Sequence, residues 1–281
     1  MGAGSVGSDP NLSASMATLV TFHAHPDDEA IGVGGTVLRA VAAGHRVVLV
    51  VATSGEEGEV EDGFLTSGES LGDRRREETL RAASLLGVAR VEFLGYRDSG
   101  MMGAESNAHP DAFWQAEVEQ AAHRLAAILM EETADVVTFY DANGGYGHPD
   151  HIQVHRVGAR AAEVAGTPRV YESTINRDRV AALAEAAVAA GLEGWDEDEE
   201  GSFDDLGLPE DELTTVVDVS GHVERKRQAM AAHASQIAEG SWWLQLPDDV
   251  FRVAFGEEWF ARRKPVFEGG DLERSLFADG S

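Results

Sequence analysis

Short apolar segments alternate with longer amphipathic segments along the first two-thirds of the chain. The apolar segments are rich in β-branched residues and predict strands at 17–22, 46–53, 91–94, 135–140 and 169–174. Helices are predicted between them, from about 26 to 43 and at 74–86, 112–132 and 151–164. Strands that alternate with helices are typical of parallel sheets with crossover helices. The pattern therefore predicts an α/β fold with an open, mostly parallel, Rossmann-like sheet flanked by helices.

The last third is less regular. It predicts a helix at 178–190, a strand at 214–219 and a helix at 223–237. Residues 193–212 hold eleven acids and no Lys or Arg, which predicts a solvated surface loop. The tail from Gly240 carries several aromatic residues: Trp242, Trp243, Phe251, Phe255, Trp259 and Phe260. We expect this tail to cover the sheet edge, with a substrate wall as the alternative.

Composition excludes several classes of protein. The chain has 50 acidic and 22 basic residues, and a net charge of −28 repels nucleic acid. It has no apolar stretch of membrane-spanning length, and its first fifteen residues lack the pattern of a secretory signal. The absence of cysteine excludes thiolate ligands and nucleophiles and fits a reducing cytoplasm. Any metal site must therefore use histidine and carboxylates.

Two polar clusters follow predicted strands. His25-Pro26-Asp27-Asp28-Glu29 comes after the first strand, and Tyr146-Gly147-His148-Pro149-Asp150-His151 comes after the fourth. Ligands of open parallel sheets bind outside the carboxyl ends of the strands, so both clusters are expected at one crevice. Two imidazoles, one carboxylate and an open position for water form a common hydrolytic zinc shell. A free carboxylate beside the ion, such as Asp27 next to Asp28, can then act as a base.

The two clusters carry a family resemblance. HAHPDDE (23–29) and NGGYGHPDH (143–151) resemble the LmbE-like (PIG-L) zinc-dependent N-deacetylase family. Within that family the chain is similar to two mycothiol-pathway groups, the N-acetylglucosaminyl-inositol deacetylases and the mycothiol S-conjugate amidases. The resemblance covers residues 18–164 well and the last third loosely. It implies an LmbE-like core at 17–175, a flexible tail at 1–16, and a C-terminal part of the same domain at 176–281.

The resemblance also implies roles for individual residues. The zinc ligands would be His25, Asp28 and His151, and Asp27 would be the general base. His148, oriented by Asp150, would stabilise the oxyanion or protonate the leaving amine. Tyr146 would donate a hydrogen bond to the same oxyanion.

Substrate contacts follow from two further matches. The segment LGDRRREE (71–78) places Arg75 as a sugar or inositol contact, and DSGM (98–101) places Asp98 and Met101 in the substrate site. One position departs from the S-conjugate amidases, which carry a lysine where this chain has Gly32. That difference weakens the resemblance to the amidases, and residues 32–35 match the broad family better than either mycothiol-pathway group.

The sequence thus predicts a zinc-dependent hydrolase that removes an N-acetyl group from a glucosamine-type amide. A zinc amidase acting on mycothiol S-conjugates, or on a larger amide such as a glycosylated natural product, is the alternative. Fe²⁺ is a second candidate metal, because a His₂Asp shell suits both ions. The expected partner is a small N-acylated sugar, without nucleic acid or membrane, and a homo-oligomer stays open. A nucleotide-binding role fails, since the GVGG segment (32–35) lacks the GxGxxG spacing. A non-catalytic metal- or sugar-binding module is a further alternative.

Overall fold

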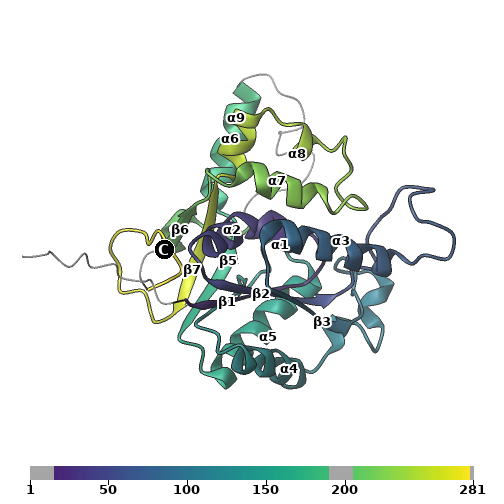
Figure 1. The fold of residues 1–281 in the computed structure, drawn as a ribbon, viewed down its shortest axis with the longest axis horizontal. Coiled ribbons are helices and arrows are strands. Elements are labelled where there is room, and N and C mark those ends of the chain that lie inside the picture. The colour runs from purple at the N-terminus through teal and green to yellow at the C-terminus, as the bar shows by residue number, and fades with distance from the viewer. Residues whose placement is uncertain (1–15, 190–204, 279–281) are drawn as a thin grey trace, which may run out of the picture.

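The computed structural model describes residues 16–189 and 205–278, which are built around a seven-stranded sheet (Figure 1). Its strands are β1 (Thr18–His23), β2 (Arg46–Thr53), β3 (Arg90–Tyr96), β4 (Val136–Tyr140), β5 (Arg169–Thr174), β6 (Thr215–Asp218) and β7 (Glu257–Lys264). The strand order is β3-β2-β1-β4-β5-β7-β6. The first five strands pair in parallel, and β7 is antiparallel to both β5 and β6. The prediction of a mostly parallel, Rossmann-like sheet is confirmed.

Helices cover both faces of this sheet (Figure 1). One face carries α1 (Asp28–Gly32), α2 (Gly34–Ala42) and α3 (Leu71–Leu86), and the other carries α4 (Val118–Glu131) and α5 (Pro149–Ala165). The later helices are α6 (Arg177–Ala189), α7 (Val223–Ala231), α8 (Trp242–Gln245) and α9 (Asp248–Phe255), and α7 packs on the first three helices. Short 3₁₀ helices lie at Glu105–Ala108, Phe113–Gln115 and Glu210–Glu212. No helix in the described ranges is long and apolar enough to cross a membrane.

The apolar strands are buried on both sides, as strands between two helical layers should be. In β1, Val20 and Phe22 pack with α4 and α5, whereas Leu19 packs with α2 and α7 on the opposite face. In β2, every residue from Val47 to Thr53 is buried. The alternation of side chains therefore divides the core into two layers, one on each face of the sheet.

Several boundaries differ from the sequence predictions. The first predicted helix is broken at Val33, whose backbone φ of −137° separates α1 from α2. The predicted helix at 112–132 begins as a 3₁₀ turn, and α4 starts only at Val118. The prediction that the aromatic tail covers the sheet edge is wrong for residues 257–264. They form strand β7, which lies inside the sheet between β5 and β6. Five of the eight residues of β7 are charged, so no apolar pattern marks it as a strand. The predicted tail before Met16 and residues 193–204 of the acidic segment lie outside the described residues.

A buried ion pair joins β7 to the helices of the core. Lys226 of α7 donates to Glu258 Oε1 at 2.7 Å, and both side chains are almost fully buried. The same carboxylate accepts the backbone N–H groups of Gly35 and Thr36, at 2.8 and 2.7 Å, in the first turn of α2. A Cβ on Gly35 would lie 2.5 Å from Val219, so the glycine permits this close packing. Among the described residues, Glu258 is the one carboxylate paired with the Lys226 ammonium, and it also caps the first turn of α2.

Replacing Glu258 by alanine should destabilise the fold strongly, because it leaves the Lys226 ammonium buried without its carboxylate. The expected loss in the free energy of unfolding is about 3–5 kcal/mol. Chemical denaturation followed by circular dichroism measures it.

The neighbouring Glu257 supplies the control. It pairs with Arg179 at 3.0 Å, but both side chains are about one-third exposed. An exposed pair contributes about 0.2–1 kcal/mol, so Glu257→Ala should cost far less than Glu258→Ala. Equal losses in the two variants would contradict this account of the buried pair.

Candidate metal centre and active site

The first polar cluster forms a tight turn between β1 and α1. The backbone N–H of His25 donates to Asp28 Oδ2 at 2.7 Å, which closes the turn. Asp28 and Glu29 lie in the first helical turn, where carboxylates favour the positive end of the helix dipole. Asp27, just before the helix, has a backbone φ of +98°, a conformation that costs free energy for any residue with a Cβ. The turn therefore holds His25, Asp27 and Asp28 close together in one short segment.

The second cluster spans the end of the loop after β4 and the first turn of α5, whose N-cap is His148. Asp141 organises this loop by accepting the backbone N–H groups of Asn143 and Gly145 at 2.9 and 3.0 Å. Gly144 has a φ of +65°, and a Cβ there would lie 2.4 Å from the Cβ of His151. His151 Nδ1–H donates to the Gly144 carbonyl at 3.1 Å. This hydrogen bond leaves the lone pair of His151 Nε2 directed into the site.

Because β1 and β4 pair in parallel, the two turns meet at one edge of the sheet. His25 Nδ1 lies 3.3 Å from His151 Nε2, and Asp28 Oδ2 lies 3.6 and 3.5 Å from these two nitrogens. A tetrahedral ion with ligand bonds of about 2.0–2.1 Å requires ligand atoms about 3.3–3.4 Å apart. The three donor atoms therefore fit the coordination geometry of a single divalent cation.

A second layer of contacts fixes the ring of His25. Its Nε2 lies 3.2 Å from Asp150 Oδ2 and 3.4 Å from Asp98 Oδ1. A carboxylate on the far nitrogen holds a metal-binding histidine in the tautomer whose other nitrogen is free for the ion. The Asp150 carboxylate also accepts the backbone N–H of Ser99 at 2.9 Å and the Ser99 hydroxyl.

The electrostatics of two of the three donors, Asp28 and His151, suit a cation. Burial would lower the pKa of His25, but hydrogen bonds to Asp150, Asp28 and Asp98 hold it well above its usual value. Burial alone would raise the pKa of Asp28, but the nearby rings of His151 and His25 hold it well below its usual range. Burial, together with the neighbouring rings of His25 and His148, lowers the pKa of His151 to about 3. At neutral pH this arrangement supplies an ionised carboxylate and a neutral imidazole, the forms that bind metals.

Asp27 adjoins the donor Asp28 in the chain, and both side chains are partly buried. Burial raises the pKa of its carboxyl group to about 6, with Arg75 opposing the change and Asp28 adding to it. Arg75 Nη2 lies 3.3 Å from Asp27 Oδ2. A carboxyl group with a pKa near neutrality is well matched to general acid–base chemistry.

The remaining predicted catalytic residues also lie at this edge. The ring centre of His148 lies 4.6 Å from that of His25, and the hydroxyl of Tyr146 lies 3.4 Å from His151 Nε2. Tyr146 is 48% exposed, which places it where the site opens to solvent. His148 Nδ1 accepts the backbone N–H of Asp150 at 3.1 Å, so the neutral ring carries its proton on Nε2. The sequence suggested that Asp150 orients His148. In the structure its backbone N–H contacts His148, whereas its carboxylate contacts His25.

The three predicted substrate contacts differ in their surroundings. Asp98 is buried, accepts the backbone N–H groups of Gly100 and Glu57, and faces His25. Met101 is 56% exposed on the loop that follows. Arg75 is buried, and its guanidinium donates to the carbonyl oxygens of Gly55 and Pro26 at 2.7 and 2.6 Å. In this structure Arg75 therefore binds the turn that carries Asp27.

Sequence reasoning did not identify three residues that contact this site. Ser99 lies within the DSGM segment and Glu29 within HAHPDDE, but neither motif predicts a role for these two residues. His233 comes from the last third of the chain, where no motif was noted, yet its Nε2 lies 2.7 Å from Glu29 Oε1.

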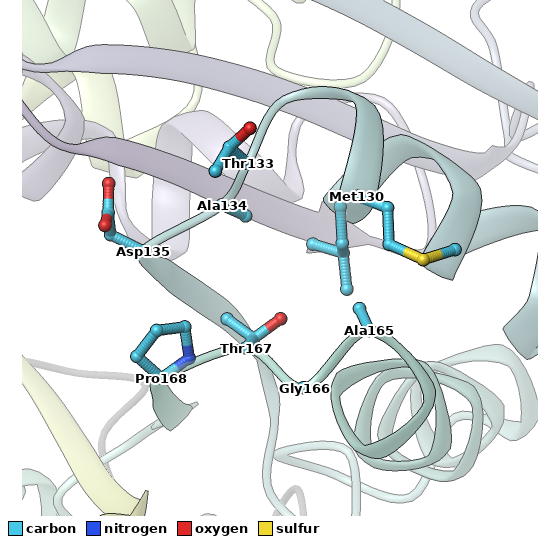
Figure 2. Close-up of a pocket in the computed structure, with 9 residues that line it drawn as sticks. Met130, Thr133, Ala134, Asp135, Ala165, Gly166, Thr167 and Pro168 are labelled. Atoms are coloured by element: carbon cyan, nitrogen blue, oxygen red, sulfur yellow. The ribbon is translucent and has the colours of Figure 1, made fainter.

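A separate hollow of about 310 Å³ lies at the opposite end of the sheet (Figure 2). The ends of α4 and α5 and the starts of β4 and β5 surround it, and Figure 2 shows Met130, Asp135 and Thr167 along its wall. None of the site residues described above lines it.

Comparisons with known proteins agree with this site. The profile of the PIG-L family, described as GlcNAc-PI de-N-acetylase, matches residues 20–162. A 1D-myo-inositol 2-acetamido-2-deoxy-alpha-D-glucopyranoside deacetylase of Thermobifida fusca is 41% identical, covering 86% of this chain and 91% of that protein. A Catenulispora acidiphila protein of the same description is 39% identical, covering 96% and 91%.

A solved structure has the same fold. The N,N'-diacetylchitobiose deacetylase of Pyrococcus horikoshii superposes with a TM-score of 0.60 at 21% identity, covering 96% of this chain and 91% of that one. With both motifs at one sheet edge and relatives matched over most of their length, this chain belongs to the PIG-L family of de-N-acetylases.

Proposed function

We propose that this chain removes the N-acetyl group from an N-acetylglucosaminyl-inositol in a zinc-dependent hydrolysis. The observation that carries the proposal is the spacing of 3.3–3.6 Å among His25 Nδ1, Asp28 Oδ2 and His151 Nε2. The names of the curated relatives support the choice of substrate, because the matches extend over more than nine-tenths of those proteins.

His25, Asp28 and His151 would hold the ion. Two imidazoles and one carboxylate suit Zn²⁺, and Fe²⁺ accepts the same donors. When bound, such an ion lowers the pKa of a water molecule and polarises a carbonyl group.

Asp27 is proposed as the general base and then the general acid. Its carboxylate takes one proton from water as the water oxygen forms a bond to the amide carbon. The same proton then passes to the amide nitrogen as the C–N bond breaks, which releases the free amine and acetic acid, and the acid then loses its proton to the solvent to give acetate. The buried, partly neutralised surroundings of Asp27 favour both states of its carboxyl group, since its pKa is raised to about 6.

Tyr146 and His148 are proposed to stabilise the developing oxyanion. The Tyr146 hydroxyl lies at the mouth of the site, and His148 carries its donating proton on Nε2 because Nδ1 accepts a backbone N–H. A donor directed at such an oxygen is worth about 3 kcal/mol in the transition state. Asp98 and Met101 remain proposed contacts for the sugar. Arg75 is proposed to hold the turn and the carboxylate of Asp27 in place.

Asp27→Asn should abolish most turnover while metal binding persists. The amide cannot accept the proton of water, so kcat should fall about 10²–10⁴-fold. Steady-state acetate release and elemental analysis of the same sample measure both quantities. Asp248→Asn, an 85% exposed aspartate on α9, is the control and should leave kcat unchanged. Full activity in Asp27→Asn would exclude the proposed role.

His151→Ala should weaken zinc binding more than about 100-fold, because it removes a direct ligand rather than a supporting group. His155→Ala is the matched control, one helical turn further along α5, where the ring donates to the Tyr140 carbonyl and lies near Glu172. Competition with a zinc-binding dye gives both affinities. If the two variants bind zinc equally well, residue 151 is not a ligand.

A panel of substrates tests the proposed specificity. The N-acetylglucosaminyl-inositol should give the highest kcat/KM, above N-acetylglucosamine, N,N'-diacetylchitobiose and an S-conjugate of mycothiol. Amine release can be followed with fluorescamine. A higher kcat/KM for the S-conjugate would instead identify an amidase of larger substrates.

A further inference from the structure

The backbone of Asp27 is held in an unusual conformation by its neighbours. In the described ranges, Asp27 and Thr133 are the two residues other than glycine with a positive φ. The backbone N–H of Asp27 points back and donates to Glu29 Oε2 at 3.1 Å. Its carbonyl accepts the N–H groups of Ala30 and Ile31 at 3.0 and 3.1 Å, which begin α1. The Glu29 carboxylate thus holds the backbone N–H of Asp27 at the residue with the positive φ.

Glu29 is in turn held by a residue more than two hundred positions away. Its second oxygen, Oε1, accepts a hydrogen bond from His233 Nε2 at 2.7 Å, and both side chains are only 1% exposed. His233 Nδ1 is buried and has no hydrogen-bond partner among the described residues. Nε2 must therefore carry the proton for this contact, and Glu29 is the partner that fixes the ring.

The segment that carries His233 is itself anchored around the site. Ser235 donates to the buried carboxylate of Glu78 on α3, from its backbone N–H at 3.1 Å and its hydroxyl at 2.6 Å. Gln236 Nε2 donates to the carbonyl of Glu59 at 2.9 Å. Arg75, on the same helix as Glu78, reaches the Pro26 carbonyl and Asp27. The turn carrying Asp27 is thus held by two separate sets of hydrogen bonds. Arg75 makes one set, and the Glu29–His233 pair makes the other.

We propose that Glu29 and His233 are positioning residues for Asp27. They keep its backbone at positive φ and so direct its carboxylate into the site. The inference rests on the proposed role of Asp27 as the catalytic base. It also makes a separate claim about the backbone conformation of the turn, which can be tested without measuring the reaction. Neither residue is assigned a contact with substrate or metal.

His233→Leu and His233→Gln distinguish positioning from simple packing. Leucine fills space but cannot donate to Glu29, whereas the glutamine amide can donate from a point near that of Nε2. Small misplacements of a reacting group cost about 100-fold, so we expect His233→Leu to lower kcat by that order. KM and zinc content should stay near wild type, and His233→Gln should recover most of the lost kcat.

His45→Leu is the matched control. His45 is a buried histidine immediately before β2, at the opposite end of the strand layer from Asp27, and its ring stacks on Phe277 with centres 3.9 Å apart. It should lower thermal stability and leave kcat unchanged. A His233→Leu variant with wild-type kcat, or a His233→Gln variant as impaired as His233→Leu, would overturn the inference.

A crystal structure of the variant gives a readout that needs no activity. We expect the φ of Asp27 to leave the positive region in His233→Leu and to keep it in His233→Gln. An unchanged φ in His233→Leu overturns the inference even if the wild-type protein deacetylates no tested sugar, which would separately refute the proposed function. If His233→Leu does not fold, Glu29→Gln replaces it, since the amide can accept from only one of the two donors. That variant should also lose kcat with unchanged zinc content, and wild-type kcat in it overturns the inference.

Discussion

The close approach of the turns after β1 and β4 determines what this site can do. The two strands are neighbours in the sheet, and Tyr140 at the end of β4 joins them by accepting the Ala24 N–H at 3.2 Å and stacking on His151. Nitrogen atoms of side chains 126 positions apart, His25 Nδ1 and His151 Nε2, are thereby brought within 3.3 Å of each other. The distance between the two clusters is therefore set by the pairing of β1 with β4, and a site built on paired strands is held more precisely than one built on loops alone.

This arrangement concentrates buried and partly buried carboxylates, which are unfavourable unless each is paired. Asp28 and Asp150 receive backbone N–H groups as well as imidazoles, and Asp27 receives the guanidinium of Arg75. The positive φ of Asp27 costs a further amount of about 1–3 kcal/mol. Such costs are tolerated where the surrounding contacts over-determine the conformation, and here those contacts come from three separate parts of the chain.

The sequence predicted the parts of the structure that depend on local pattern. β2 and β5 begin and end where the sequence predicts, and the two polar clusters come after β1 and β4 as expected. It did not predict β7, because the charges of that strand hide its burial between two neighbours. It also did not predict the contact of His233 with Glu29 or the orientation of Arg75, because these contacts are set by the packing of segments distant in the chain. Spacing along the chain carries no information about such contacts.

The central claim is that one divalent ion is held by residues from these two turns. Anomalous diffraction at the zinc absorption edge, from crystals of the zinc-loaded protein, tests it most directly. The account predicts a single strong peak within bonding distance of His25 Nδ1, Asp28 Oδ2 and His151 Nε2. A peak bound elsewhere, or rings of His25 and His151 that do not share the ion, would contradict it.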